Sequence, residues 1–311
     1  MAKTPTSRRR NALVALGGQG SDRPAGEVWL VGAGPGDPEL LTLKALKALQ
    51  RADVVVHDGL VSEAILELAP PSARRLSVAK RKSRHSYAQD EINRLLVAFA
   101  REGLTVVRLK GGDPFIFGRG GEELEACRAA GIVCHVVPGV TAALAAGASA
   151  GAPLTHRGAA QAVTFVTGHA AADGEPDLDW PSLARANQTV VIYMGVSTAA
   201  PIAARLIEAG RAGSTPALVV EDASLPTERR IVTTLAGLSD AAAAVTGPAL
   251  LIVGEAMALA QANPSPSRGG ARGGGFVETD TALAGSPVIA EAAPHPRPLP
   301  SRGRGATGRG R

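Results

Sequence analysis

The stretch "RLKGGDPFIFGRGGEE", residues 108 to 123, is the most informative part of this chain. Its glycines allow the backbone to approach a ligand closely, and Phe115, Ile116 and Phe117 add an apolar wall. A solvent-exposed loop would not carry three large apolar residues in a row, so the alternative is that these residues plug the core. We interpret the stretch as a ligand-binding loop.

Strands and helices alternate outward from this loop in both directions. Apolar runs rich in β-branched residues predict strands at residues 28–34, 53–58, 104–109, 131–137, 162–168, 188–195, 215–221, 229–235 and 248–254. Apolar residues at helical spacing predict helices at residues 41–52, 89–102, 120–130 and 198–209. In the first helix Thr42 is the expected cap, and the expected buried face consists of Leu43, Ala45, Leu46, Ala48 and Leu49.

This pattern predicts an α/β protein with two domains. Continuous apolar strands joined by helices indicate a mostly parallel sheet, covered on both faces, in an N-terminal domain of residues 27–139. Strands outnumber helices in residues 140–261, which predicts a mixed sheet in the C-terminal domain. Residues 1–26 are expected to be a disordered leader, with an export signal as the alternative, and residues 262–311 a disordered tail rich in Pro, Gly and Arg.

The basic character of the chain lies in its ends. The leader and the tail carry a net charge of +8, whereas the core between them has a net charge of −3. This distribution weakens the case for a basic nucleic-acid-binding core. The two cysteines, Cys127 and Cys134, are too few for a disulfide framework, and we interpret them as apolar core residues in a reducing cytosol. No apolar run is long enough to cross a membrane.

Chemically informative residues stand in four loops of the predicted N-terminal domain, at residues 34–37, 57–58, 80–82 and 110–114. Ligands of open α/β sheets bind beyond the carboxyl ends of the strands, so we expect these loops to share one rim.

Both glycine loops on this rim contain an acidic residue that is followed by proline. Asp37 stands where a dinucleotide-binding loop would have its third glycine, and Asp113 follows two glycines. A phosphate site requires free amides without a nearby negative charge. A ligand with a cationic head and no phosphate, such as S-adenosylmethionine, fits these loops better, although ordinary turn chemistry would also explain them.

Several motifs of the chain, taken together, resemble those of one known family. Together with the stretch quoted first, "VGAGPGDPELLTLKAL", "VVHDGLVS", "VPGVTAALAA" and "GAPLTHR" resemble the signatures of the tetrapyrrole methylases, and of the uroporphyrinogen-III C-methyltransferases in particular, over residues 27 to 259. The resemblance implies two α/β domains with S-adenosylmethionine in the cleft between them, and a homodimer. It also implies that the chain lacks a dinucleotide site of the Rossmann type.

The resemblance also implies roles for individual residues. Asp58 matches the proton acceptor proposed for the family, and Lys80 matches the proposed proton donor. The residues that would bind the methyl donor are Pro35, Gly111, Gly112, Asp113, Ile116, Thr141, Ala142, Met194 and Ala223. Gly59 stands where many members have Arg or Ala, which puts a substrate role for that position in doubt.

A basic run suits the anionic substrate that the resemblance implies. Residues 74–84 contain six Lys or Arg and no acid, in a core that is otherwise acidic. A solvated basic face is the alternative. The expected substrate-binding residues are Arg81, Lys82, Arg84 and Arg119.

The expected function is therefore methylation of uroporphyrinogen III at C2 and C7 by S-adenosylmethionine, which gives precorrin-2 for siroheme and cobalamin synthesis and S-adenosylhomocysteine as by-product. No metal, nucleic acid or membrane is expected to take part, and a cytoplasmic enzyme is predicted. The 26 residues before the core leave no room for a second catalytic module, so we expect one activity. The alternatives are a later corrin-pathway methylase, such as one acting on precorrin-4, and an RNA-associated protein that acts through its Arg/Gly tail.

Overall fold

A computed structural model of the chain describes residues 26–79, 87–169 and 176–262. The predicted leader before residue 26 and the predicted tail after residue 262 lie outside the described residues. None of the helices within the three described ranges combines the length and the apolar character that a membrane span requires.

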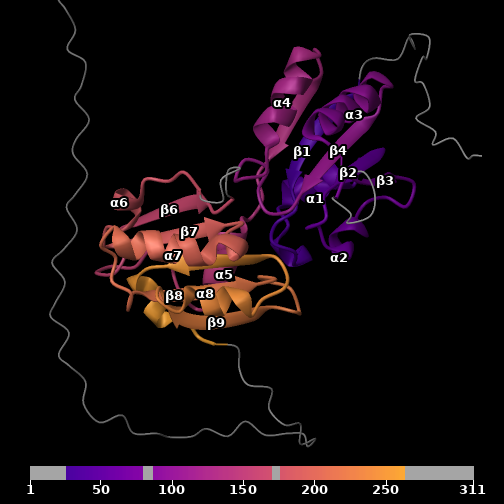
Figure 1. Ribbon diagram of the computed structural model, residues 1–311. Helices are drawn as coiled ribbons and strands as arrows, with labels where there is room; N and C mark the ends of the chain where they lie inside the picture. The colour runs from indigo at the N-terminus through magenta and orange to yellow at the C-terminus, as the bar shows by residue number, and fades with distance from the viewer. Residues whose placement is uncertain (1–25, 80–86, 170–175, 263–311) are drawn as a thin grey trace, which may run out of the picture. The chain divides into compact units, whose positions relative to one another are not determined.

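The first sheet has five strands, all parallel, in the order β3-β2-β4-β1-β5 (Figure 1). The strands are β1 (Glu27–Gly32), β2 (Val54–His57), β3 (Arg74–Ser77), β4 (Thr105–Lys110) and β5 (Val133–Val137). The helices of this half are α1 (Leu43–Leu49), α2 (Glu63–Leu66), α3 (Gln89–Arg101) and α4 (Gly120–Ala129), and a short 3-10 helix η1 (Pro38–Leu40) precedes α1. The mostly parallel sheet is confirmed, whereas β3 was not predicted because its sequence RRLS lacks an apolar run.

Helices cover both faces of this sheet, which explains the continuous apolar strands. Val55 of β2 packs on one face with side chains of α1 and α2. Its neighbour Val54 points to the other face and packs with side chains of α3 and α4. Cys127 is a buried member of this second cluster, which confirms its interpretation as an apolar core residue, whereas Cys134 is half-buried and packs against the cluster.

The expected buried face of α1 was partly wrong. Thr42 caps the helix as predicted, because its hydroxyl accepts a hydrogen bond from the Ala45 amide at 3.1 Å. Leu43, however, is 76% exposed, and the buried residues of α1 are Ala45, Ala48 and Leu49. At 100° per residue Leu43 lies well away from Leu49 around the helix, so the two leucines cannot share a narrow apolar stripe.

The second sheet also has five strands, in the order β6-β7-β10-β8-β9, and it is mixed as predicted. Only β6 and β7 are parallel, and the other three neighbouring pairs are antiparallel. The strands are β6 (Ala162–Thr167), β7 (Gln188–Tyr193), β8 (Pro216–Glu221), β9 (Arg229–Thr234) and β10 (Ala249–Val253). The helical elements are α5 (Ala142–Ser149), α6 (Trp180–Leu183), η2 (Val196–Thr198), α7 (Ala199–Glu208), α8 (Leu238–Ala243) and η3 (Glu255–Leu259).

This sheet is likewise covered on both faces. Ile192 of β7 packs with side chains of α7 and α8, and its neighbour Val191 packs on the opposite face with α5 and η3. The domain boundary near Gly139, between the two sheets in the sequence, stays a prediction.

Three glycines pack tightly where β1, β4 and β5 end. A Cβ atom on Gly32 would lie 2.5 Å from the amide nitrogen of Gly139 and 2.7 Å from the carbonyl oxygen of Gly112. A Cβ atom on Gly139 would overlap the same carbonyl oxygen. The loops that follow these three strands can therefore meet only because the residues at the contact lack side chains.

We expect Gly139→Ala to lower the free energy of unfolding by about 1–3 kcal/mol, because the added methyl group must displace backbone. Gly121→Ala in α4 is the control, because a Cβ atom there meets nothing within 4 Å. Alanine in a helix should leave stability unchanged or raise it by about 0.5–1 kcal/mol. Urea denaturation of both variants measures the difference, and equal stabilities would contradict the crowding argument.

Candidate functional site

The loops after β1, β2 and β4 lie together, as the shared-rim prediction requires. Gly34 and Gly112 pair through two backbone hydrogen bonds of 3.1 and 2.7 Å. The amide of Gly111 donates to a carboxylate oxygen of Asp58 at 3.2 Å. Three of the four predicted loops thus meet, and the fourth, residues 80–82, lies outside the described residues.

The two acidic residues of the glycine loops accept hydrogen bonds from backbone amides, and Asp113 also binds one after β5. Asp37 accepts a hydrogen bond from the Glu39 amide at 2.9 Å and caps η1. Asp113 accepts from the amides of Phe115 at 2.8 Å and Gly139 at 3.0 Å, one with each carboxylate oxygen. These amides are therefore occupied by carboxylates and cannot hold a phosphate. The Asp37 hydrogen bond is ordinary turn chemistry, and it leaves the ligand-binding interpretation of this loop a prediction.

Asp58 ties the end of β2 to the glycine loop after β4. One carboxylate oxygen accepts from the Leu60 amide at 3.0 Å, and the other accepts from Gly111. The side chain of Ser62 makes no capping hydrogen bond to α2. Ser62 occupies the capping position, but its hydroxyl donates to the carbonyl oxygen of Gly36 at 2.7 Å, because the loop after β1 lies beside it.

Left-handed backbone gathers at the loops proposed to hold a ligand. Six residues other than glycine have positive φ angles in the part of the chain that the structure describes, and all but Asn187 lie in these loops. The five are Phe117, Arg119, Met194, Asp222 and Ser224, with φ between 51° and 70°. For bulky residues this conformation is strained, and strained backbone is typical of functional sites.

The three apolar residues of the first-quoted stretch do not plug the core. Phe115 is 52% exposed and Phe117 is 38% exposed, whereas Ile116 is half-buried. The alternative interpretation as a core plug was therefore wrong for both phenylalanines. Exposed rings beside a glycine loop remain available to contact a ligand.

Thr141 and Ala142 lie at the start of α5. Thr141 is buried at 8% exposure, and Ala142 is the first helical residue and is half-buried. Met194 follows β7 directly and is 51% exposed.

Ala223 follows β8 in a loop that contacts the loop after β1. Its neighbour Ser224 accepts a hydrogen bond from the Asp37 amide at 3.3 Å. A Cβ atom on Gly36 would lie 2.5 Å from the Leu225 side chain, so these two loops are closely packed. Residues separated by 187 positions in the sequence thus meet at the predicted donor residues.

Arg119 is the one predicted substrate-binding residue that the described ranges include. Its guanidinium forms two hydrogen bonds of 2.7 Å with the carboxylate of Glu122. This pairing lowers the pKa of Glu122, and both side chains are exposed. Lys80, Arg81, Lys82 and Arg84 lie outside the described residues.

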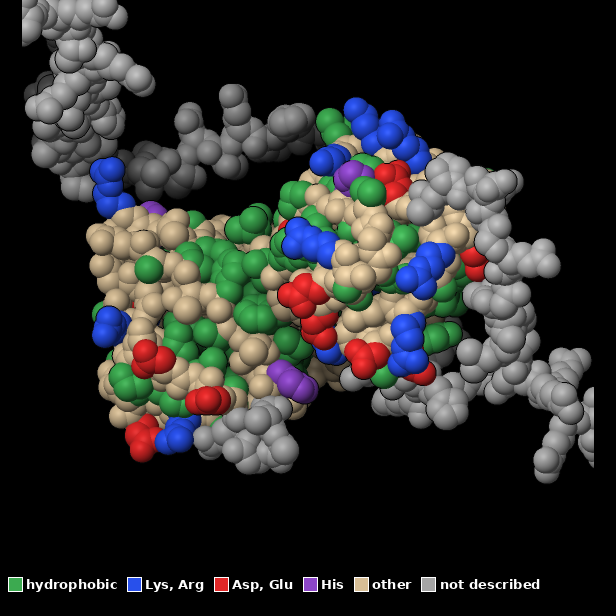
Figure 2. All heavy atoms as spheres, turned by 90° about the horizontal axis from the view of Figure 1, so that it is seen from above, with side chains coloured by type: hydrophobic (Ala, Val, Ile, Leu, Met, Phe, Trp, Pro, Cys, Tyr) green, Lys and Arg blue, Asp and Glu red, His purple; other side chains and the backbone are tan. Residues whose placement is uncertain are grey.

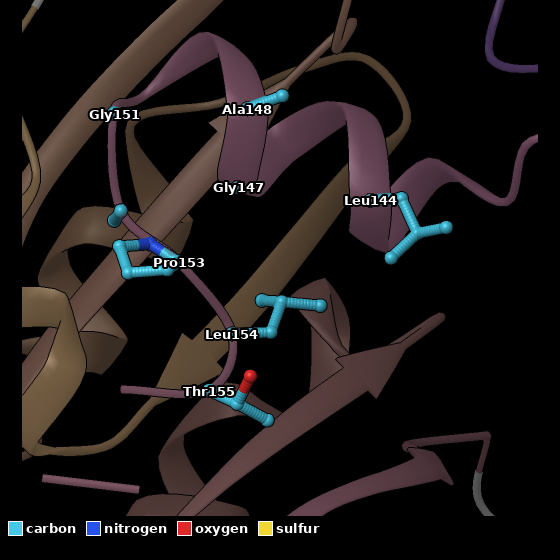
Figure 3. A pocket seen from close by; sticks show the side chains of 8 residues that line it. Leu144, Gly147, Ala148, Gly151, Pro153, Leu154 and Thr155 are labelled. Atoms are coloured by element: carbon cyan, nitrogen blue, oxygen red, sulfur yellow. The ribbon is translucent and has the colours of Figure 1, made fainter. Parts of the chain in front are cut away.

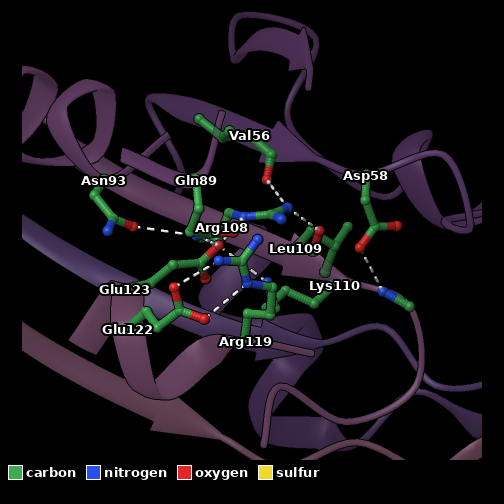
Figure 4. A network of polar contacts seen from close by, with 11 residues as sticks. Val56, Asp58, Gln89, Asn93, Arg108, Leu109, Lys110, Arg119, Glu122 and Glu123 are labelled. Atoms are coloured by element: carbon green, nitrogen blue, oxygen red, sulfur yellow. Dashed lines mark hydrogen bonds and ion pairs between the residues drawn. The ribbon is translucent and has the colours of Figure 1, made fainter. Parts of the chain in front are cut away.

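A buried charge network behind the glycine loop was missed in the sequence (Figure 4). The fully buried Glu123 of α4 accepts hydrogen bonds of 3.0 Å from both Arg108 and Lys110 of β4, and Gln89 of α3 donates to the same oxygen at 3.2 Å. Burial and the nearby Arg108 lower the pKa of Lys110, against the opposing effect of Glu123. The available signal was the two cations at alternate positions of an apolar strand, which require a buried counter-charge.

Two pockets lie against α5, and the second of them is lined by sequence neighbours of the predicted donor residues Thr141 and Ala223. One, of about 410 Å³, is lined mainly by small apolar residues between Leu144 and Thr155 (Figure 3). The other, of about 420 Å³, includes Asp37, Leu40 and Ser224. None of the predicted donor-binding residues lines either pocket. The first offers few polar groups to orient a ligand, so we place the site at the rim loops instead.

The surface shown in Figure 2 carries mixed charges and a broad apolar area. Basic and acidic side chains are interspersed there, and apolar side chains lie exposed between them. Within the described ranges no group of three or more His, Cys, Asp or Glu could hold a metal ion.

The chain is similar to known proteins over most of its described residues. The family model described as "Tetrapyrrole (Corrin/Porphyrin) Methylases" matches residues 27–239. "Siroheme synthase 1" of Yersinia enterocolitica is 54% identical over 241 residues, which cover 78% of this chain and 51% of that protein. The chain thus spans about half the length of the curated relatives it matches.

Two solved structures are similar over most of the described chain. The uroporphyrin-III C-methyl transferase from Thermus thermophilus, complexed with S-adenyl homocysteine, is 46% identical with a TM-score of 0.65, and the match covers 75% of this chain and 100% of that one. A cobalt precorrin-4 methyltransferase is 32% identical with a TM-score of 0.66, and the match covers 74% of this chain and 95% of that one.

We expect Glu123→Ala to lower the free energy of unfolding by about 3–5 kcal/mol, because it leaves two buried cations without their counter-charge. Glu125→Ala is the control on the same helix, because Glu125 is exposed, and its cost should stay within about 0.5 kcal/mol. Chemical denaturation compares the two variants. A small loss for Glu123→Ala would show that the network contributes little to stability.

Proposed function

The chain belongs to the tetrapyrrole (corrin/porphyrin) methylases, and from this premise we propose that it transfers methyl groups from S-adenosylmethionine to uroporphyrinogen III at C2 and C7, giving precorrin-2. The Thermus thermophilus relative with S-adenyl homocysteine supports both the donor and the substrate class. The observation that carries the proposal is the rim itself, where Asp37 and Asp113 hold the backbone amides of Glu39, Phe115 and Gly139.

The donor site is proposed at the loops that meet on the rim. A nucleotide that binds through pyrophosphate needs free amides, and here carboxylates take them. A sulfonium nucleoside needs no such amides and tolerates nearby negative charge. The residues proposed to bind it are Pro35, Gly111, Gly112, Asp113, Ile116, Thr141, Ala142, Met194 and Ala223.

The geometry of the loops supports these assignments. Gly112 has a φ angle of +68°, which only glycine adopts without strain, and its pairing with Gly34 brings Pro35 beside the second glycine loop. Met194 and the two neighbours of Ala223 have left-handed backbone, which directs these segments away from regular strand geometry.

Methyl transfer requires mainly alignment. A pyrrole carbon attacks the methyl group of the sulfonium in line, so holding the two reactants in register can lower the barrier by up to about 7–11 kcal/mol. A rim built from closely packed backbone suits this task, because its atoms have little freedom to move.

Asp58 is proposed to take the proton that the methylated ring loses, or to stabilise positive charge on that ring. Its two oxygens each accept one backbone hydrogen bond, and an ionised carboxylate has further acceptor sites. The two amides therefore orient the carboxylate without using all of its lone pairs. Lys80 is the proposed proton donor.

The polycarboxylate substrate is proposed to bind Arg81, Lys82, Arg84 and Arg119. Because Glu122 already holds the Arg119 guanidinium, a substrate carboxylate would have to compete with it. The product is proposed to serve siroheme and cobalamin synthesis, and we expect a cytoplasmic homodimer. The cobalt precorrin-4 methyltransferase is less similar, at 32% identity, which favours uroporphyrinogen III over a later corrin substrate.

The experiment that tests this function incubates the full chain with uroporphyrinogen III and S-adenosylmethionine and follows the tetrapyrrole by mass spectrometry. We expect a gain of two methyl groups and formation of S-adenosylhomocysteine. An unchanged tetrapyrrole, in a preparation that binds S-adenosylhomocysteine by calorimetry, would contradict the substrate assignment. Methylation of a precorrin-4 sample under the same conditions would favour the alternative.

We expect Asp58→Asn to retain S-adenosylhomocysteine binding and to lose turnover by about 100-fold or more, because the amide can neither accept the proton nor carry a negative charge. Asp53→Asn is the matched control, because Asp53 also binds a backbone amide, that of Thr105 at 2.8 Å, but lies at the opposite end of β2. Its turnover should be unchanged. If both variants keep full turnover, Asp58 has no part in catalysis.

A further inference from the structure

Tyr193 links the glycine loop after β4 to the start of α5. It is the last residue of β7, and its ring lies 5.0 Å from the ring of Phe117 and 5.8 Å from that of Phe165, measured between centroids. Phe117 belongs to the glycine-rich stretch, and Phe165 belongs to β6. The packing of these rings holds the Tyr193 hydroxyl at a defined place beside α5.

That hydroxyl has two partners at the start of the helix. It accepts a hydrogen bond from the Ala143 amide at 3.3 Å, and it lies 2.6 Å from the hydroxyl oxygen of Thr141. Ala143 is the second residue of α5, so its amide is one that the helix itself cannot satisfy.

Thr141 occupies the capping position of α5, yet its side chain makes no capping hydrogen bond. A threonine at this position ordinarily accepts from the second or third amide of the helix. Here Tyr193 binds the second amide in its place. The Thr141 side chain is therefore not needed to cap α5.

The hydrogen atoms can be assigned from the chemistry of the two hydroxyls. The distance between the two oxygens does not fix which hydroxyl donates. Because a phenol is the stronger acid and therefore the better donor, we assign the Tyr193 O–H as the donor to Thr141. Burial and the nearby Asp113 carboxylate raise the pKa of Tyr193, so the phenol keeps this proton at neutral pH. The hydroxyl hydrogen of Thr141 is then left without a partner in this pair.

We propose that Tyr193 is a positioning residue of the donor site, which caps α5 and turns the Thr141 hydroxyl so that it donates a hydrogen bond to the methyl donor. The inference rests on the proposed function, in which Thr141 contacts the sulfonium nucleoside. Without the Tyr193 hydroxyl, Thr141 turns back to cap Ala143 in the ordinary way, and the contact with the ligand is lost.

A double-mutant cycle on the full chain tests this, with the affinity for S-adenosylhomocysteine measured by calorimetry. We expect Tyr193→Phe to weaken binding by about 2- to 10-fold, the usual contribution of one hydrogen bond, while preserving the ring packing. Thr141→Val should weaken binding at least as much, and Thr141→Ser should bind like the wild-type protein. The double variant should bind no more weakly than Thr141→Val alone.

Two results would overturn the proposal. One is unchanged affinity in Tyr193→Phe, and the other is a further loss when Tyr193→Phe is added to Thr141→Val, because Tyr193 would then act independently of Thr141. If Tyr193→Phe does not fold, Thr141→Val and Thr141→Ser still test the proposal. Equal affinities of these two variants for S-adenosylhomocysteine would contradict a role of the Thr141 hydroxyl. Tyr87→Phe, at a residue 40% exposed, is the control for loss of a tyrosine hydroxyl and should bind normally.

The same measurement separates this inference from the proposed function. Wild-type protein that fails to bind S-adenosylhomocysteine contradicts the function itself, before any variant is compared. Wild-type protein that binds, together with an unaffected Tyr193→Phe variant, contradicts the role of Tyr193 alone.

Discussion

Close approach of backbone to backbone at the ends of β1, β4 and β5 is the constraint on which the site depends. Gly32 and Gly139 meet each other and the Gly112 carbonyl oxygen there at distances that no side chain on Gly32 or Gly139 would allow. The Asp113 carboxylate then ties the loop after β4 to the Gly139 amide, and Gly112 pairs with Gly34. Three segments far apart in the sequence become one surface, because Gly32 and Gly139 have no side chain at the contact.

This surface has a chemical consequence for the ligand. Carboxylates hold the amides that a phosphate would need, and Asp58 holds a further one at Gly111. What the rim offers instead is apolar rings, acceptor oxygens and strained backbone at Phe117 and Met194. Such a surface is suited to a ligand with positive charge and no phosphate, in agreement with the family to which the chain belongs.

Two sets of contacts hold the rim loops in place, one around the buried Glu123 beside β4 and one around Tyr193 of the second sheet. The buried Glu123 neutralises one of two cations on β4, the strand that leads directly into Gly111, so the loop begins from a rigid strand end. From the other side, Tyr193 caps α5 and packs on Phe117. A side chain of the second sheet thereby packs on the glycine loop that follows β4, so elements of both sheets meet at the proposed donor site.

The sequence by itself predicted most of the strands and the helices α1, α3, α4 and α7, because periodic apolar patterns are local and report burial directly. It missed β3 and the helices α5, α6 and α8, whose short segments lack such a pattern. It also predicted that the loops after three strands share a rim, since parallel strands end at a common edge. Which strands are neighbours was not readable, and neither were the partners of particular side chains. Ser62 binds Gly36 rather than its own helix, and Arg108 and Lys110 share Glu123. Only the tertiary structure decided these contacts, because it joins residues up to 187 positions apart, such as Asp37 and Ser224, through a strand order that no local pattern records.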